Sequence, residues 1–217
     1  MAYDLEEQEQ IDQIKAFWAK YGNLISWVLI IALAGYAGWT YWNNMQNNRT
    51  SHAADLYTTL ETAVQAKDSA KAKNAAEDLR KDFGSTVYAQ FGALASAKMA
   101  QDAGDTKTAK AQLQWMIDNK LNDEFVAIAR LHLSAILIDE KAYDDAMKLL
   151  AADVPAKFQS LVLDRKGDIL AAQNKLDEAR AMYKSALEKI DEKSPAHGFI
   201  QLKLESVGGQ APAKSAA

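Results

Sequence analysis

The chain has 217 residues, a formal net charge of −4 and no cysteine. Its first 23 residues carry 2 basic and 5 acidic side chains, so the remainder is close to neutral and offers no basic stripe for a nucleic-acid backbone. Without cysteine the chain has no disulfide, no thiolate chemistry and no Cys-type zinc site. These properties exclude nucleic-acid binding and cysteine-dependent functions.

One apolar stretch, residues 24–42, dominates the N-terminal part of the chain. No residue between Lys20 and Arg49 is charged, and a helix through the stretch would rise about 28 Å, close to the thickness of bilayer hydrocarbon. Aromatic residues stand near both ends, as at the two interfaces of a membrane. The sequence therefore predicts a single transmembrane helix, and its candidate membrane-spanning residues are Leu24, Trp27, Leu29, Ile31, Leu33, Gly38, Trp39 and Trp42.

Two other interpretations of this stretch remain open. A buried core helix can be equally apolar, although it rarely needs aromatic residues at both ends. A cleaved signal peptide is the second, because residues 32–34 (ALA) resemble a cleavage site; the acidic segment before the stretch is unlike the short basic start of a signal.

The charges that flank the stretch predict its orientation. Lys15, Lys20 and the α-amino group lie on the N-terminal side, against Arg49 alone on the other side, so the N-terminus is expected in the cytoplasm. The predicted organisation is a cytoplasmic segment (1–23), a transmembrane helix (24–42), a periplasmic domain (43–207) and a disordered tail (208–217) of a bacterial inner-membrane protein.

The chain beyond the stretch is predicted to be all-α. It is rich in Ala, Leu, Lys, Glu and Gln, has only three prolines, and shows no alternation typical of strands. Gly84 and Gly104 are expected as left-handed helix ends, and Asp105, Asp123 and Ser194 as N-caps. The predicted helices are 44–66, 69–82, 85–102, 105–119, 123–140, 143–152, 156–173, 176–191 and 195–207.

The helices form pairs that repeat. Residues 105–113, 142–150 and 175–183 align with a small residue followed four positions later by a large one, and the small residues Ala109, Ala146 and Ala179 stand 37 and 33 apart. Such a period of helical hairpins is typical of tetratricopeptide repeats, whose hairpins bury their apolar faces only by stacking. We therefore predict a tetratricopeptide-like α-solenoid, closed by the last helix.

The sequence contains no recognisable catalytic, cofactor or metal motif. His52, His132 and His197 are far apart, and the acidic pairs at 139–140 and 144–145 flank a helix–helix turn, where carboxylates serve as caps and dipole partners. The solenoid instead predicts a concave groove for a peptide or helix, lined by the first helices of successive pairs. The candidate groove residues are Phe91, Leu94, Lys98, Ile128, Leu131, Ala135, Leu161, Asp164 and Asp168.

Several segments resemble the YfgM family, the ancillary subunits of the bacterial SecYEG translocon. The likeness runs from about Gln8 to Leu204 and is carried by the acidic N-terminus, residues 38–43 (GWTYWN), 91–96 (FGALAS), 111–114 (AQLQ) and 165–168 (RKGD). The resemblance implies a single-pass inner-membrane protein with a periplasmic tetratricopeptide-like domain. It supplies no catalytic residue and no cofactor.

The resemblance also implies partners. These are the SecYEG translocon, the membrane-anchored prolyl isomerase PpiD, and periplasmic chaperones or exported chains. The resemblance further implies a role in the negative control of an envelope-stress response. The expected role is a non-enzymatic scaffold that assists newly exported proteins. The alternative is a tetratricopeptide adaptor for another envelope assembly complex.

Overall fold

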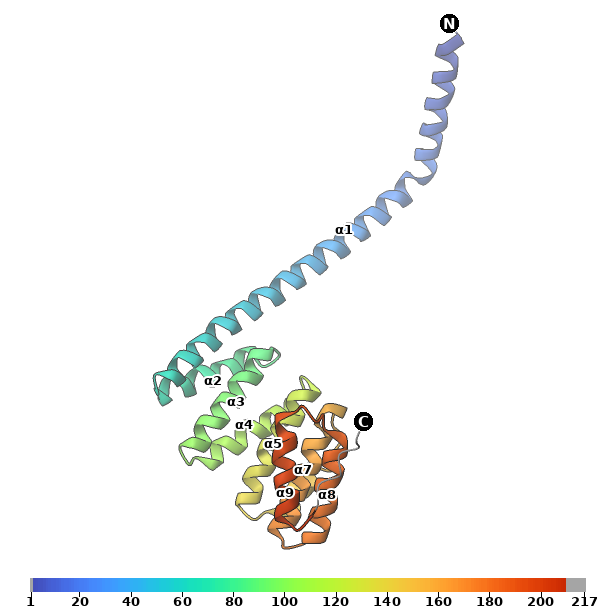
Figure 1. Ribbon diagram of the computed structural model, residues 1–217. Coiled ribbons are helices and arrows are strands. Elements are labelled where there is room, and N and C mark those ends of the chain that lie inside the picture. The colour runs from blue at the N-terminus through green and yellow to red at the C-terminus, as the bar shows by residue number, and fades with distance from the viewer. Residues whose placement is uncertain (1, 210–217) are drawn as a thin grey trace. The chain divides into compact units, whose positions relative to one another are not determined.

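The computed structural model describes residues 2–209, with side chains from Glu9 onward, and this part of the chain is helical without a strand. The all-α prediction is therefore confirmed (Figure 1). The helices are α1 (Ala2–Gln65), α2 (Ser69–Phe83), α3 (Val87–Asp102), α4 (Thr106–Asn119), α5 (Asp123–Asp139), α6 (Tyr143–Leu149), η1 (Ala156–Phe158), α7 (Gln159–Ala172), α8 (Leu176–Lys189) and α9 (Pro195–Ser206).

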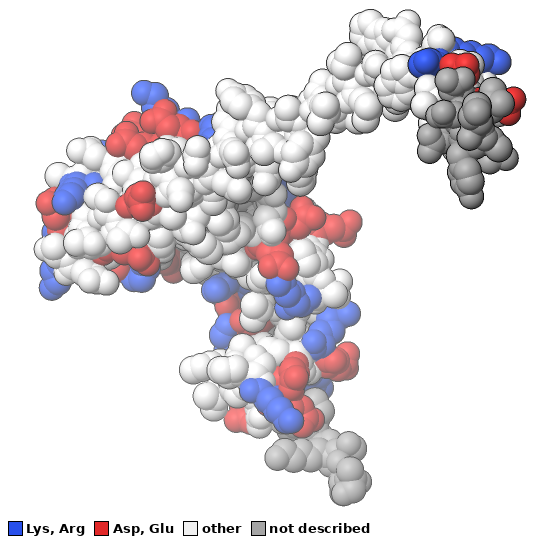
Figure 2. All heavy atoms as spheres, turned by 90° about the horizontal axis from the view of Figure 1, so that it is seen from above, with Lys and Arg blue, Asp and Glu red and all other residues white. Residues whose placement is uncertain are grey.

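The chain divides into two compact units, residues 1–52 and the residues from Ala53 onward. Helix α1 contributes to both, because it continues without interruption through the apolar stretch to Gln65. Figure 2 shows a length of the molecule without Lys, Arg, Asp or Glu, and charges of both signs interspersed elsewhere. Among the described helices, only α1 is long and apolar enough to cross a membrane.

The same turn joins the two helices of each of four hairpins. One residue per turn has a positive φ: Lys67 at 55°, Gly104 at 77°, Lys141 at 61° and Asn174 at 61°. The N–H of the following residue donates to a carbonyl five positions earlier, as from Asp105 to Ala100 (2.7 Å) and from Lys175 to Leu170 (2.9 Å). These bonds occupy carbonyls that the end of the first helix would leave without a partner.

The turns place a small buried residue at the equivalent point of each second helix. Ala109, Ala146 and Ala179 are fully buried, as the repeat predicts, and Ala72 occupies the same place in α2 with 1% exposure. A side chain of this size lets the two helices of a hairpin approach closely. Both helices of the first hairpin, the end of α1 and α2, were predicted, but the hairpin was not among the aligned repeats because Ala76 replaces the large residue found in the other three.

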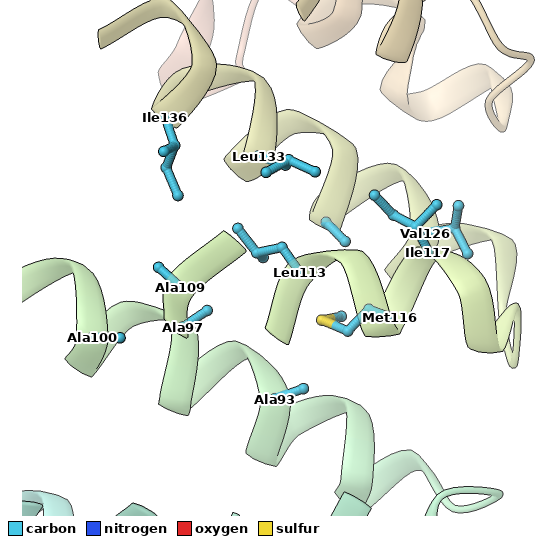
Figure 3. Close-up of a cluster of buried hydrophobic side chains, with 11 residues drawn as sticks. Ala93, Ala97, Ala100, Ala109, Leu113, Met116, Ile117, Val126, Leu133 and Ile136 are labelled. Carbon is cyan, nitrogen blue, oxygen red and sulfur yellow. The ribbon is translucent and has the colours of Figure 1, made fainter. Parts of the chain in front are cut away.

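Each core cluster joins the two helices of a hairpin with the helix that follows, as α3 and α4 with α5 and α7 and α8 with α9. In Figure 3, Ala93, Ala97 and Ala100 of α3 face Leu113 and Met116 of α4, with Leu133 of α5 on the other side. Helix α9 closes the last hairpin with Ile200 and Leu204, which pack against Tyr183 and Leu170.

Four predictions about helix ends are wrong. Gly84 is right-handed (φ −55°); a Cβ there would lie 2.8 Å from the Arg80 carbonyl oxygen, so close packing accounts for the glycine. The N-cap of α5 is Asn122, whose side chain accepts from the Glu124 N–H, rather than Asp123. Helix α6 ends at Leu149, three residues before the predicted end at 152, and the predicted helix 156–173 begins with the short 3₁₀ turn η1.

Two glycines that were predicted to be in the disordered tail take part in the end of α9. Gly208 has φ 76°, and the Gly209 N–H donates to the Leu204 carbonyl. Both residues therefore cap α9, although the sequence placed them in the disordered tail. The rest of that predicted tail lies outside the described residues.

Candidate partner-binding groove

An open pocket lies on the predicted groove side of the first two hairpins. Its volume is about 380 Å³, and its lining includes Phe91, Leu94 and Lys98 of α3, the three groove candidates of that helix. The other lining residues are Tyr57 from the end of α1, Ala95, Ala97 and Gln101 of α3, Leu113 of α4 and His132 of α5. We call this the α3 pocket.

Two aromatic rings line the α3 pocket, Tyr57 and Phe91, and they contact two further rings, Tyr88 and Phe125. Phe91 lies with its ring centroid 5.7 Å from that of Tyr57 and 5.4 Å from that of Phe125, and Tyr88 lies 5.9 Å from Tyr57. All are tilted or edge-on, the arrangements that the ring quadrupole favours. Phe91 keeps 37% of its surface exposed. Tyr57, Tyr88 and Phe125 were not among the groove candidates. The i, i+3 spacing of Tyr88 and Phe91 is the signal in the sequence that indicates this cluster.

Polar side chains stand around the α3 pocket. Lys98 pairs with Asp102 one turn further along α3, and both are well exposed. Burial and the nearby Glu61 carboxylate raise the pKa of the Tyr57 hydroxyl. Partial desolvation of the ring and the positive charge of Arg165 lower the pKa of His132, so its imidazole is neutral at pH 7.

The remaining apolar groove candidates are half-buried. Leu131 packs against a core cluster that includes Ala146 and Ile169, so part of its side chain serves stability. Ile128 and Leu161 are also intermediate in exposure. These three residues do not border the α3 pocket.

Asp164 and Asp168 are engaged within the chain. The Lys203 ammonium of α9 lies 2.8 Å from the Asp164 carboxylate and 2.9 Å from that of Asp168. The Tyr183 hydroxyl donates to Asp168 at 2.9 Å, and Arg165 pairs with the same carboxylate at 3.2 Å. Burial raises the pKa of Asp164. These carboxylates therefore hold the cap helix α9 in place.

A second, larger pocket of about 640 Å³ lies between α4, α5 and α6, with Leu133, Leu137 and Leu149 among its lining residues. The charges beside it are paired, Lys110 with Glu140 at 2.7 Å and Lys148 with Asp145 at 3.4 Å. The acidic pairs at 139–140 and 144–145 thus contribute ion pairs at a turn. No group of three or more His, Asp or Glu side chains with the geometry of a metal site occurs among the described residues.

The candidate membrane-spanning side chains are exposed along α1. No residue of its most apolar window is buried, and a Cβ added at Gly38 would meet nothing within 4 Å. A core helix of a water-soluble protein would be mostly buried, so this exposure favours a membrane span over that alternative. The large candidates are 55–66% exposed: Leu24, Trp27, Leu29, Ile31, Leu33, Trp39 and Trp42.

The fold and the groove define a class of protein, a stack of helical hairpins preceded by one long apolar helix. The family model of the tetratricopeptide repeat-like domain matches residues 15–209. Among curated proteins, the ancillary SecYEG translocon subunit of Neisseria gonorrhoeae is 32% identical over 208 residues, which cover 95% of this chain and 100% of that protein.

Two further relatives have the same name. The ancillary SecYEG translocon subunit of Haemophilus influenzae is 29% identical over 83% of this chain and 91% of its own length. The ancillary SecYEG translocon subunit of Escherichia coli is 26% identical over 93% of this chain and 96% of its own length. The chain therefore belongs to the family of ancillary SecYEG translocon subunits, the YfgM family, as the sequence motifs predicted.

Proposed function

We propose that this chain is a single-pass inner-membrane protein that associates with the SecYEG translocon and acts as a non-enzymatic scaffold for newly exported proteins. The observation that carries the proposal is the end-to-end similarity to ancillary SecYEG translocon subunits. The apolar stretch of α1 supports membrane attachment. In this proposal residues 24–42 span the bilayer, residues 1–23 are cytoplasmic and residues 43–207 form the periplasmic domain.

The proposed mechanism is binding without chemistry. A membrane anchor keeps the groove close to the channel exit, which raises the effective concentration of the groove for partners at the same site. Weak contacts are then occupied often. The proposed partners are a PpiD-type prolyl isomerase, periplasmic chaperones and emerging exported chains, and control of an envelope-stress response follows from the same contacts.

Photo-crosslinking in intact cells tests the partners. A photoreactive residue in place of Phe91 is expected to capture SecYEG subunits, the PpiD-type isomerase or exported chains, because Phe91 borders the open α3 pocket. The same residue at Lys184, exposed on α8, is the control and should give little product. Capture of subunits of a different envelope complex instead of translocon components would favour the alternative adaptor role.

Protease treatment of spheroplasts tests the orientation. The domain beyond residue 43 should be digested from outside, while an epitope within residues 1–23 is protected. Mass spectrometry of the mature protein tests retention of the anchor, since cleavage after residues 32–34 would remove the N-terminal segment. Protection of the C-terminal domain would overturn the proposed topology.

A further inference from the structure

We propose that the α3 pocket binds one uncharged aromatic side chain carried by an extended polypeptide segment. The inference rests on the proposed function in one respect, because it names the ligand class of the same groove. It adds pocket residues that the groove prediction did not contain, above all Tyr57, Gln101 and His132.

The ring arrangement leaves a place for a further aromatic side chain. The Phe91 ring contacts both Tyr57 and Phe125, with centroids at 5.7 and 5.4 Å, and it keeps 37% of its surface exposed. Leu94 and Leu113 supply aliphatic surface to the same pocket. An entering ring would remove apolar area from water and would extend the chain of tilted and edge-on contacts.

The charges around the pocket select an uncharged side chain. Lys98 is paired with Asp102 at the edge of the pocket. His132 is the other titratable lining residue, and its imidazole is neutral at pH 7. A charged side chain would lose water here without gaining an unpaired opposite charge, which is unfavourable.

Two polar side chains at the pocket favour an extended segment over a helix. Within residues 9–209, neither the Gln101 amide nor the His132 imidazole makes a hydrogen bond in the structure, and both residues are exposed. The amide offers both donors and acceptors, and the neutral imidazole offers one of each. An extended segment presents unpaired backbone N–H and C=O groups to such side chains, whereas the backbone groups of a helix are already paired.

Peptide binding to the full-length protein in lipid nanodiscs tests the proposal. The probes are fluorescein-labelled GSQGXGQSG peptides in which X is Phe, Ala or Lys, measured by fluorescence anisotropy. The Phe peptide should bind at least about 10-fold more tightly than the Ala and Lys peptides. Equal binding of the Phe and Ala peptides would overturn the proposal.

Variants assign the binding to the pocket. Phe91→Ala should abolish the preference for Phe, and Phe91→Trp should retain it. Gln101→Ala, at an exposed position, should weaken the binding of the Phe and Ala peptides equally, because it removes a contact between the Gln101 amide and the peptide backbone. Phe199→Ala is the matched control, since Phe199 is an aromatic of α9 that is 68% exposed and does not line the pocket.

Other outcomes are separated by the same assay. Unchanged Phe preference in Phe91→Ala, with an unchanged melting temperature, would overturn the assignment to this pocket. Tighter binding of an amphipathic helical peptide, or self-association of the protein that is lost in Phe91→Ala, would replace the extended segment by a helix or a second copy. Co-purification of the wild-type protein with SecYEG is measured separately. If the wild-type protein does not co-purify with SecYEG, the proposed function is contradicted, whereas the peptide-binding result is unaffected.

Discussion

Gly167 of α7 faces the ring of Tyr183 of α8 so closely that a Cβ on Gly167 would lie 2.5 Å from Tyr183 Cε1. Tyr183 is 3% exposed and also packs against Ile200 and Leu204 of α9. One ring therefore fixes the separation of the last two paired helices and supports the cap.

This contact predicts the effect of one methyl group. Gly167→Ala should lower the free energy of unfolding by about 1–3 kcal/mol, because the ring cannot move without disturbing α9. The measurement is thermal unfolding of the full-length protein in detergent, followed by circular dichroism. Gly198→Ala is the control: nothing lies within 4 Å of the added Cβ, so helix propensity should stabilise it by about 0.5–1 kcal/mol. An unchanged melting temperature for Gly167→Ala would contradict the packing.

Lys203 predicts a charge effect at the cap. Lys203→Met should destabilise the domain by about 2 kcal/mol, because Asp164 and Asp168, 13% and 18% exposed, lose their ammonium partner. Lys193→Met, in the exposed loop before α9, should change little. Burial already raises the pKa of Asp164, and without Lys203 it would protonate more readily, so the difference between variant and wild type should shrink on acidification. A difference that grows in acid would refute this account.

The hairpin turns predict a stabilising substitution. Lys141 holds φ 61°, a conformation that costs a residue with a Cβ about 1 kcal/mol, so Lys141→Gly should raise the melting temperature by a few degrees. Lys184→Gly, in the middle of α8, should lower it instead because glycine weakens a helix interior. Equal effects of both substitutions would show that the left-handed turn is not strained.

Gln90 is a buried amide whose Oε1 and Nε2 have no hydrogen-bond partner in the structure. Gln90→Leu should therefore stabilise the protein by about 1 kcal/mol, since an unpaired buried amide costs more than an aliphatic group of similar size. Chemical denaturation of the full-length protein measures the change. Destabilisation would mean that an ordered water satisfies the amide.

His132 predicts a dependence of stability on pH. Its pKa in the folded protein lies below the ordinary value of 6.5, so as the pH falls below about 6.5 the unfolded chain binds a proton first and the folded state loses stability. The loss is complete once the pH is below the folded pKa. His132→Asn should remove this component, seen as a smaller drop in melting temperature between about pH 7.5 and 5.5. The same drop in both proteins would exclude His132 as its source.

Local patterns determined most of the fold. The uncharged run of residues 24–42 and the spacing of Ala109, Ala146 and Ala179 depend on neighbours within one helix or turn, which the sequence displays directly. The helices therefore lie close to the predicted bounds, and the family resemblance agrees with the relatives. The expected membrane topology and the partners remain predictions.

The tertiary structure decided the relations between distant residues. Lys203 meets Asp164 across 39 positions, and Tyr57 reaches Phe91 only because the end of α1 packs beside α3. No periodicity records such contacts, since they depend on how helices stack. The sequence by itself determined which segments are helices and which face of each is apolar; packing alone decided which carboxylates are held by Lys203 and which rings border an open pocket.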